Sequence, residues 1–285
     1  MIRLLALILV LLFTGCVATD TATVESQHWT IGHASAIEYA VEYYPYGPAL
    51  DRTFTAPRPD FDAWTRRRMQ LDLRAIDGGG IDQVQLIVDA LEVALDRSVL
   101  ERVPLFLAEA ADRAPDLSIV LLADLRRLPE DRLQSFLDAC FALNLYLYEN
   151  YLQVDNTPLL LFRPAAEYSG VAHIGLRTEI AEWYQPDGFN STAALEHAWM
   201  STNSKDILLP ACPPAEPEEW AKERQRGKPI AKAIAAARAL QPRRIVLRSW
   251  NDFSDGSFIQ KNETDGDEVY HSIRKMLNTG ELESE

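Results

Sequence analysis

The chain has 285 residues, with 42 acidic and 28 basic side chains and a formal net charge of −14. This negative charge argues against a nucleic-acid-binding protein and against docking on a membrane through a polybasic surface. The length is sufficient for one large domain with a complete hydrophobic core.

Residues 1–15 have the pattern of a secretory signal peptide. Arg3 precedes an apolar run of about a dozen residues, and the small residue Gly15 ends the run. The run is too short to span a membrane as a helix. The segment Phe13-Thr14-Gly15-Cys16 resembles the lipobox of bacterial lipoproteins. The resemblance implies cleavage before Cys16 and lipidation of its thiol, which would anchor the protein to a membrane without spanning it.

An ordinary secretory signal with an incidental cysteine is the alternative. Val17 stands where inner-membrane lipoproteins of enteric bacteria carry Asp, which favours the outer membrane. Without residues 1–15 the chain would have 285 − 15 = 270 residues. We expect residues 16–33 to form the lipidated cysteine and a tether, 34–277 a single domain, and 278–285 a flexible acidic tail. We also expect a monomer.

Eight short apolar runs are predicted to be β-strands. The first, residues 36–43, alternates apolar and polar side chains. The next three are continuously apolar, as strands buried on both faces are, and lie at 81–88, 117–123 and 158–162. Weaker candidates lie at 171–176, 195–200 and 206–211, and the last strand covers 244–250.

Helical patterns fall between several of these strands, at 60–76, 97–113, 129–148 and 228–240. Strand–helix alternation predicts an α/β fold, and eight strands in this length indicate a (β/α)8 TIM-like barrel. Residues 163–210 leave little room for full helices, so we expect this part to be irregular. A doubly wound open sheet is the alternative. It would usually carry a Gly-rich phosphate loop after the first strand, and Tyr44-Pro45-Tyr46-Gly47 is not one.

The last predicted strand ends in an unusual set of side chains, namely Trp250, Asn251, Asp252 and Asp255. Glycoside cleavage needs one carboxyl group to protonate the leaving oxygen and a second to assist the attacking group. Neighbouring carboxylates also raise the pKa of one of the pair. The alternative is a plain loop, in which Asp252 caps the next turn and Asp255-Gly256 forms a tight turn.

Several motifs resemble glycoside hydrolases of families 99 and 71, the endo-α-mannosidase-like and α-1,3-glucanase-like enzymes. The most specific one is Trp250-Asn251-Asp252-Phe253-Ser254-Asp255-Gly256-Ser257. The shorter ones are Tyr43-Tyr44-Pro45-Tyr46-Gly47, Gly80-Ile81-Asp82 and the segment from Tyr151 to Pro158. The motifs are scattered over most of residues 36–277.

The resemblance implies that Asp255 is the catalytic acid/base and that Asp252 activates a neighbouring sugar hydroxyl. The chain departs from the family pattern at Asp255, where Glu is usual, and at Gln260, where an acid is usual. A Glu→Asp change withdraws the carboxylate by roughly 1–1.5 Å. Misplacement by about 1 Å can cost on the order of a hundredfold in rate. The resemblance therefore implies either an endo-acting glycoside hydrolase on an α-linked polysaccharide or an inactive carbohydrate-binding lipoprotein. A structural envelope protein without a glycan ligand is a third hypothesis.

In a barrel, functional residues lie where strands meet the loops that follow them. Trp250, Tyr44 and Tyr46 offer apolar faces on which sugar rings stack, although single aromatics at strand ends also cap cores. Asn251 either binds a sugar hydroxyl or has a structural role.

Carboxylates follow two of the apolar strands directly, at Asp89 and Asp124. A carboxylate at such a position contacts substrate or caps the next helix. Glu42 precedes Tyr44 and Tyr46 in the sequence. The alternation of side chains in the first strand allows Glu42 to point into the barrel.

No cofactor is expected, and the histidines show no metal-ligand spacing, so no metal site is predicted. Cys140 and Cys212 remain after the signal, and a buried free thiol is favoured for Cys140. The expected partners are an oligo- or polysaccharide and, through Cys16, a membrane of the bacterial envelope.

Overall fold

The computed structural model of the chain describes residues 37–45, 64–163, 175–181, 183–184, 205–210, 227–252, 258–262 and 266–280. All of them belong to one compact unit, Ser35–Glu285. Cys16, Tyr46, Cys212 and Asp255 lie outside the described residues, and so does the predicted strand at 195–200.

Eight strands in the described part of the chain run parallel to their neighbours in the order β6-β5-β3-β2-β1-β9-β8-β7. Their bounds are β1 Glu38–Tyr43, β2 Gln83–Asp89, β3 Ser118–Asp124, β5 Thr157–Arg163, β6 Arg177–Ile180, β7 Trp183–Tyr184, β8 Asp206–Pro210 and β9 Arg244–Arg248. The two-residue strand β4, Gln153–Val154, is antiparallel to β5.

The pairing of the first strand with the last identifies the sheet as a barrel. Glu38 to Val41 of β1 lie opposite Arg244 to Leu247 of β9, so the chain returns to its starting strand. A doubly wound sheet does not pair its first strand with its last. The (β/α)8 barrel predicted from the sequence is confirmed, and the strands within 163–210 are short and irregularly spaced, as expected.

The two faces of the sheet are buried in different apolar clusters. Outward side chains such as Val41, Leu86 and Leu247 pack with helix residues in one large apolar cluster. Inward side chains form smaller clusters, one of Ile87, Val120, Leu122, Leu159, Leu161 and Ala181 and one of Ala40, Leu208 and Val246. Burial on both faces explains why these strands read as continuous apolar runs.

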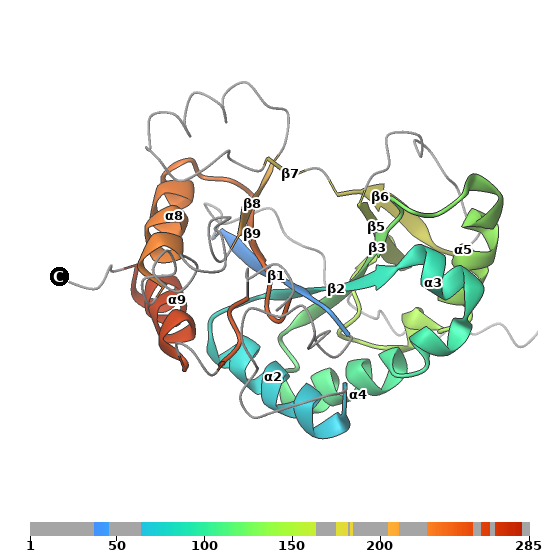
Figure 1. Cartoon of the computed structure of the whole chain (residues 1–285), viewed down its shortest axis with the longest axis horizontal. Coiled ribbons are helices and arrows are strands. Elements are labelled where there is room, and N and C mark those ends of the chain that lie inside the picture. Colours follow the sequence, from blue (N-terminus) through green and yellow to red (C-terminus); the bar gives the residue numbers. More distant parts are fainter. Residues whose placement is uncertain are drawn as a thin grey trace, which may run out of the picture. The chain divides into compact units, whose positions relative to one another are not determined.

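The helices lie outside the strands (Figure 1). They are α2 Arg66–Gly78, α3 Ala90–Leu95, α4 Val103–Arg113, α5 Leu133–Phe141, α8 Lys228–Ala239 and α9 Glu268–Thr279. The helix predicted at 228–240 is confirmed as α8. Helix α9 continues two residues past 277, the expected end of the domain.

Several predicted boundaries were wrong. The helix expected over 97–113 is a 3-10 turn, Arg97–Leu100, followed by α4, which has Pro104 in its first turn. The helix expected over 129–148 ends at Phe141, and Asn144, in the left-handed conformation at φ 51°, precedes a separate 3-10 turn, Leu145–Leu147. Helix α3 was not predicted. Most of the strand expected at 171–176 lies outside the described residues, and β6 begins directly after it at Arg177.

The N-terminal end of the barrel interior carries charged side chains. Arg244 of β9 pairs with Glu38 of β1 at 2.9 Å and with Asp206 of β8 at 3.5 Å. Gln83 of β2 donates to Glu38 at 3.1 Å, and Arg243 pairs with Asp206 at 2.9 Å. At this N-terminal end of the barrel, called the lower end below, the interior is filled by hydrogen-bonded charged side chains rather than by apolar ones.

Cys140 is a buried free thiol on α5, as favoured from the sequence. Within the described ranges, every helix is too short or too polar to cross a bilayer.

Candidate active site

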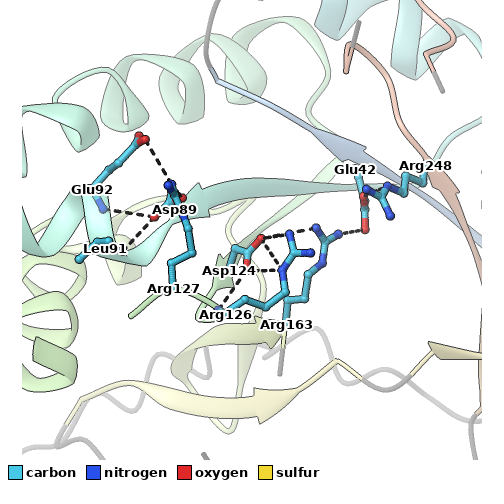
Figure 2. A network of polar contacts seen from close by, with 9 residues as sticks. All are labelled: Glu42, Asp89, Leu91, Glu92, Asp124, Arg126, Arg127, Arg163 and Arg248. Carbon is cyan, nitrogen blue, oxygen red and sulfur yellow. Dashed lines mark hydrogen bonds and ion pairs between the residues drawn. The ribbon is translucent and has the colours of Figure 1, made fainter. Parts of the chain in front are cut away.

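The carboxyl ends of β1, β2, β3, β5 and β9 bring charged side chains together at one end of the barrel, here called the mouth. Asp89, Asp124 and Arg163 lie side by side in the ladder of β2, β3 and β5. Glu42 occupies the same inward face of β1, and Arg248 is the last residue of β9. Figure 2 shows these side chains in two connected groups.

Glu42 is a fully buried carboxylate in the interior of the barrel. It accepts a hydrogen bond from Arg163 and lies 3.7 Å from Nε of Arg248. A buried charge requires partners, and here one carboxylate is shared between two guanidinium groups. Its position matches the sequence-based possibility that Glu42 points into the barrel. The two guanidinium groups offset part of the cost of burying the Glu42 carboxylate.

Arg163 links Glu42 to Asp124. Its Nη1 lies 3.9 Å from Oδ2 of Asp124, and Arg126 binds the same carboxylate through Nε at 2.9 Å and 3.1 Å and through Nη2. Burial raises the pKa of Asp124, but the hydrogen bonds and charge of Arg126 outweigh it and the net shift is downward. Burial alone would lower the pKa of Arg163, but the negative charge of Glu42 outweighs burial, and the net shift of the pKa is upward. Both groups are therefore charged at neutral pH.

Asp89 caps helix α3. Its Oδ1 accepts from the backbone N–H groups of Leu91 at 3.0 Å and Glu92 at 3.2 Å, and its other oxygen pairs with Arg127. The sequence left capping and substrate contact equally open, and the observed bonds are those of an N-cap. Figure 2 shows the carboxylate between the start of α3 and Arg127.

Tyr44 is half-buried just beyond β1 and packs against the inner apolar cluster. Burial is the largest cause of its raised pKa, and the negative charges of Glu42 and Asp252 add to it. Tyr44 is thus a neutral side chain near both carboxylates. The second tyrosine proposed for sugar stacking, Tyr46, lies outside the described residues.

The turn after β9, here called the β9 turn (Ser249–Asp252), begins with a cis peptide bond between Arg248 and Ser249. Trp250 donates its backbone N–H to the carbonyl of Glu42 at 2.7 Å. Its indole is 2% exposed and meets the ring of Tyr270 edge-on, with centroids 6.0 Å apart. Because the indole is covered, it offers no open face for a sugar ring in this structure, and its observed position is that of a core cap.

Asn251 ties the β9 turn to β1. Its Oδ1 accepts from the N–H of Tyr44 and its Nδ2 donates to the carbonyl of Tyr44, both at 2.8 Å. The amide therefore completes a two-stranded hydrogen-bonding pattern between the ends of the first and last strands. Of the two roles considered from the sequence, the observed one is structural.

Asp252 follows directly and is half-buried. Its backbone N–H donates to Oγ of Ser249 at 2.8 Å, which closes the β9 turn. The charge of Asp252 contributes to the raised pKa of Tyr44, so its side chain lies near the mouth residues of β1. Asp255 is outside the described residues, so the spacing of the two carboxylates stays a prediction.

Two arginines of the mouth, Arg126 and Arg248, were not selected from the sequence, and Arg163 was noted only as a strand-end residue without a role. The available signal was a charged residue directly after an apolar strand, which Arg163 and Arg248 share with Asp89 and Asp124. Over the described ranges, no group of three or more His, Cys, Asp or Glu side chains is arranged to hold a metal ion.

No protein-family model matches the chain, and a search of curated proteins finds no match. Solved structures do resemble it. A GH99 endo-alpha-mannosidase from Bacteroides thetaiotaomicron in complex with bis-tris-propane has a TM-score of 0.56 and 10% identity, over 85% of this chain and 98% of that one. Another structure of a GH99 endo-alpha-mannosidase from the same organism has a TM-score of 0.52 at 10% identity, over 85% and 96% of the two chains.

A protein described as glycoside hydrolase-like has a TM-score of 0.59 at 11% identity, over 87% of this chain and 97% of that one. Identities this low establish shared architecture rather than shared chemistry. The chain therefore has the barrel fold of the GH99 endo-alpha-mannosidases.

Proposed function

We propose that the protein is an endo-acting glycoside hydrolase that cleaves an α-linked polysaccharide or glycan at the mouth of its barrel. Asp255 serves as the acid that protonates the leaving oxygen and then as the base. Asp252 assists at the sugar by accepting a proton from a neighbouring hydroxyl. This assignment follows the motif resemblance and the requirement of glycoside cleavage for two carboxyl groups with separate tasks.

The observation that carries the proposal is the construction of the β9 turn. Hydrogen bonds from Trp250 to Glu42 and between Asn251 and Tyr44 fix this turn against β1, and Asp252 follows at the mouth. Catalytic groups on rigid elements at the carboxyl ends of barrel strands are the usual arrangement in this fold. The fold likeness to GH99 endo-alpha-mannosidases supports the same reading.

Arginines bind two of the carboxylates deeper in the mouth. Glu42 and Asp124 each contact guanidinium groups and act as fixed acceptors for sugar hydroxyls or as structural anchors. Asp252 lies near Tyr44, beyond the end of β9. Following the motif resemblance, we assign the chemistry to the carboxylates of the 252–255 segment.

The test is release of reducing ends from α-mannan and α-1,3-glucan oligosaccharides, followed by NMR. Wild type is expected to release sugar, and Asp255→Asn is expected to lose on the order of a hundredfold or more in rate. Glu38→Gln, at the opposite end of the barrel, is the matched control. Equal background release by wild type and Asp255→Asn would contradict the enzyme assignment.

A carbohydrate-binding protein without turnover is the second candidate. Two observations favour it: the shorter Asp255 at the second acidic position of the motif, and the burial of Trp250, which leaves fewer aromatic faces for a sugar. Binding on a glycan array without turnover identifies this candidate. Absence of both binding and turnover would instead favour a structural envelope protein.

We further propose that Cys16 is lipidated and anchors the protein to the bacterial envelope, more readily at the outer than at the inner membrane. The support is the Phe13-Thr14-Gly15-Cys16 segment and the apolar run before it. Metabolic labelling with a palmitate analogue should label wild type and not Cys16→Ser. Equal labelling of both would contradict lipidation at this residue.

A further inference from the structure

A cluster of buried polar side chains lies next to the β9 turn, on the outer side of the barrel wall. Asp72 of helix α2 is 3% exposed. Its Oδ2 accepts from the hydroxyl of Tyr43 at 2.7 Å, and its Oδ1 accepts from Nε2 of Gln260 at 2.9 Å. Trp64 donates in turn to the Tyr43 hydroxyl at 3.1 Å. Both carboxylate oxygens of Asp72 therefore accept hydrogen bonds, although the side chain is buried.

Gln260 connects this carboxylate to the β9 turn. Its backbone N–H donates to the carbonyl of Trp250 at 2.8 Å. The preceding N–H, of Ile259, donates to the carbonyls of Ser249 at 3.0 Å and Trp250 at 3.1 Å. The side chain of Gln260 thus faces α2 while its backbone is bonded to the turn that presents Asp252. A continuous set of hydrogen bonds leads from α2 to the mouth.

The group is expensive to bury, which argues for a role other than stability. Arg68, 0% exposed, forms an ion pair with Asp72 in which Nε lies 3.5 Å from Oδ2, and its Nη1 and Nη2 have no hydrogen-bond partner among the described residues. Burial raises the pKa of Asp72, and the charge of Arg68 and the hydrogen bond from Tyr43 oppose that rise. Replacing a buried ion pair by apolar side chains is often neutral or stabilising. Unsatisfied buried groups such as those of Arg68 require an explanation.

We infer that Asp72 is a positioning residue, which holds the β9 turn through Gln260 and thereby fixes Asp252 at the barrel mouth. The inference deepens the proposed function and rests on it, because the benefit of fixing the turn lies in the chemistry of Asp252. The inference also assigns a structural role to Gln260. The amide at this position donates a hydrogen bond to a buried carboxylate, which an acid would do only when protonated.

Asp72→Asn in the full chain is the first test. Asn replaces one acceptor oxygen by an NH2 donor and removes the negative charge, so the charge-assisted hydrogen bond from Gln260 is weakened or lost. We expect kcat to fall at least about tenfold with KM changed less than about twofold, because a turn displaced by about 1 Å costs rate rather than binding. Hydrogen exchange should rise in peptides that cover residues 249–252 and 258–262.

A matched control lies on the neighbouring helix α4, which is hydrogen-bonded to α2. Glu109 of α4 is a buried carboxylate whose Oε2 accepts from Nε2 of Gln70 on α2 at 2.7 Å, away from the β9 turn. Glu109→Gln removes a similar carboxylate–amide bond and should leave kcat and exchange at 249–262 unchanged after correction for stability. Gln260→Met, which removes the side-chain bond and keeps the backbone N–H, serves if Asp72→Asn does not fold, with the same expected result.

The double variant Asp72→Asn/Gln260→Glu restores a carboxylate–amide pair in the reverse direction and should recover most of the exchange protection and kcat. Unchanged exchange at the turn and unchanged kcat in both Asp72→Asn and Gln260→Met would overturn the inference. So would equal losses in Glu109→Gln. The exchange measurement needs no turnover, so an inactive wild type would count against the proposed function while exchange still decides whether Asp72 holds the turn.

Discussion

The two ends of the barrel use the same residue types but share their charges in opposite ways. At the N-terminal end, one guanidinium, Arg244, is shared between the carboxylates of Glu38 and Asp206. At the mouth, one carboxylate, Glu42, is shared between Arg163 and Arg248. An apolar layer of Ala40, Leu208 and Val246 separates the two groups.

This difference suggests how the barrel divides stability from function. Charges at the N-terminal face of such barrels serve stability, whereas the opposite face carries the chemistry. At the mouth, Arg163 contacts both Glu42 and Asp124, so the arginines there connect carboxylates of different strands.

The largest effect should separate the two ends by activity. Asp252→Asn is expected to reduce turnover of an α-linked oligosaccharide by about 10²–10⁴-fold, the usual contribution of a positioned acid or base. Glu38→Gln should stay within about threefold of wild type, because it changes only the lower end. Steady-state kinetics on both variants would measure this. A comparable loss in Glu38→Gln would show that the two ends are not functionally distinct.

The next effect concerns stability. Glu42→Gln leaves Arg163 and Arg248 facing each other in a buried site, so we expect a loss of about 3–5 kcal/mol in the free energy of unfolding. Glu38→Gln keeps Asp206 beside Arg244 and should cost only about 1 kcal/mol, the net value of a hydrogen bond. Urea denaturation followed by circular dichroism measures both. Equal losses would mean that sharing one carboxylate between two arginines does not increase the free energy of unfolding.

The smallest effect is the pH dependence of stability, with opposite signs at the two ends. The pKa of Asp124 is lowered in the folded state, so its contribution is present above about 3.9, the unfolded pKa, and disappears as pH falls through the folded pKa. The pKa of Glu38 is raised by burial, so its contribution is present below about 4.3 and is lost as pH rises through the folded pKa.

Urea titrations between about pH 3 and about pH 7 measure these slopes. Asp124→Asn should remove stability from the upper part of that range, so that the variant loses less on acidification than wild type does. Glu38→Gln should instead remove a decline that wild type shows as pH rises above about 4.3. Slopes of the same sign in both variants would contradict the assigned pKa directions.

The fold could be predicted from the sequence because its strands are buried on both faces. Continuous apolar runs located β2, β3 and β5, and alternation located β1, since Glu38 and Glu42 face the interior while Tyr39 and Val41 face the helices. Short elements were missed for the opposite reason. Strand β6 contains Arg177 and Glu179, which are charged, and α3 has only six residues, too few for a helical period to be visible.

The mouth was only partly predictable. Strand ends pointed to Asp89, Asp124 and the Trp250–Asp252 segment, yet the roles depended on partners distant in sequence. Trp250 is covered by Tyr270, and Asn251 is bonded to Tyr44, which lies 207 positions away. Pairing of Glu42 with Arg163 joins residues 121 positions apart. Residue type and local pattern show where a polar group occurs, whereas its partner follows only from the closed barrel.

The most direct test of the central claim is a crystal structure of Asp255→Asn soaked with an α-linked mannose or glucose oligosaccharide that wild type cleaves. We predict sugar density at the mouth, with hydroxyl groups within hydrogen-bonding distance of Asp252 and above the Glu42–Arg163 pair. Density at another surface, with an empty mouth, would contradict the account.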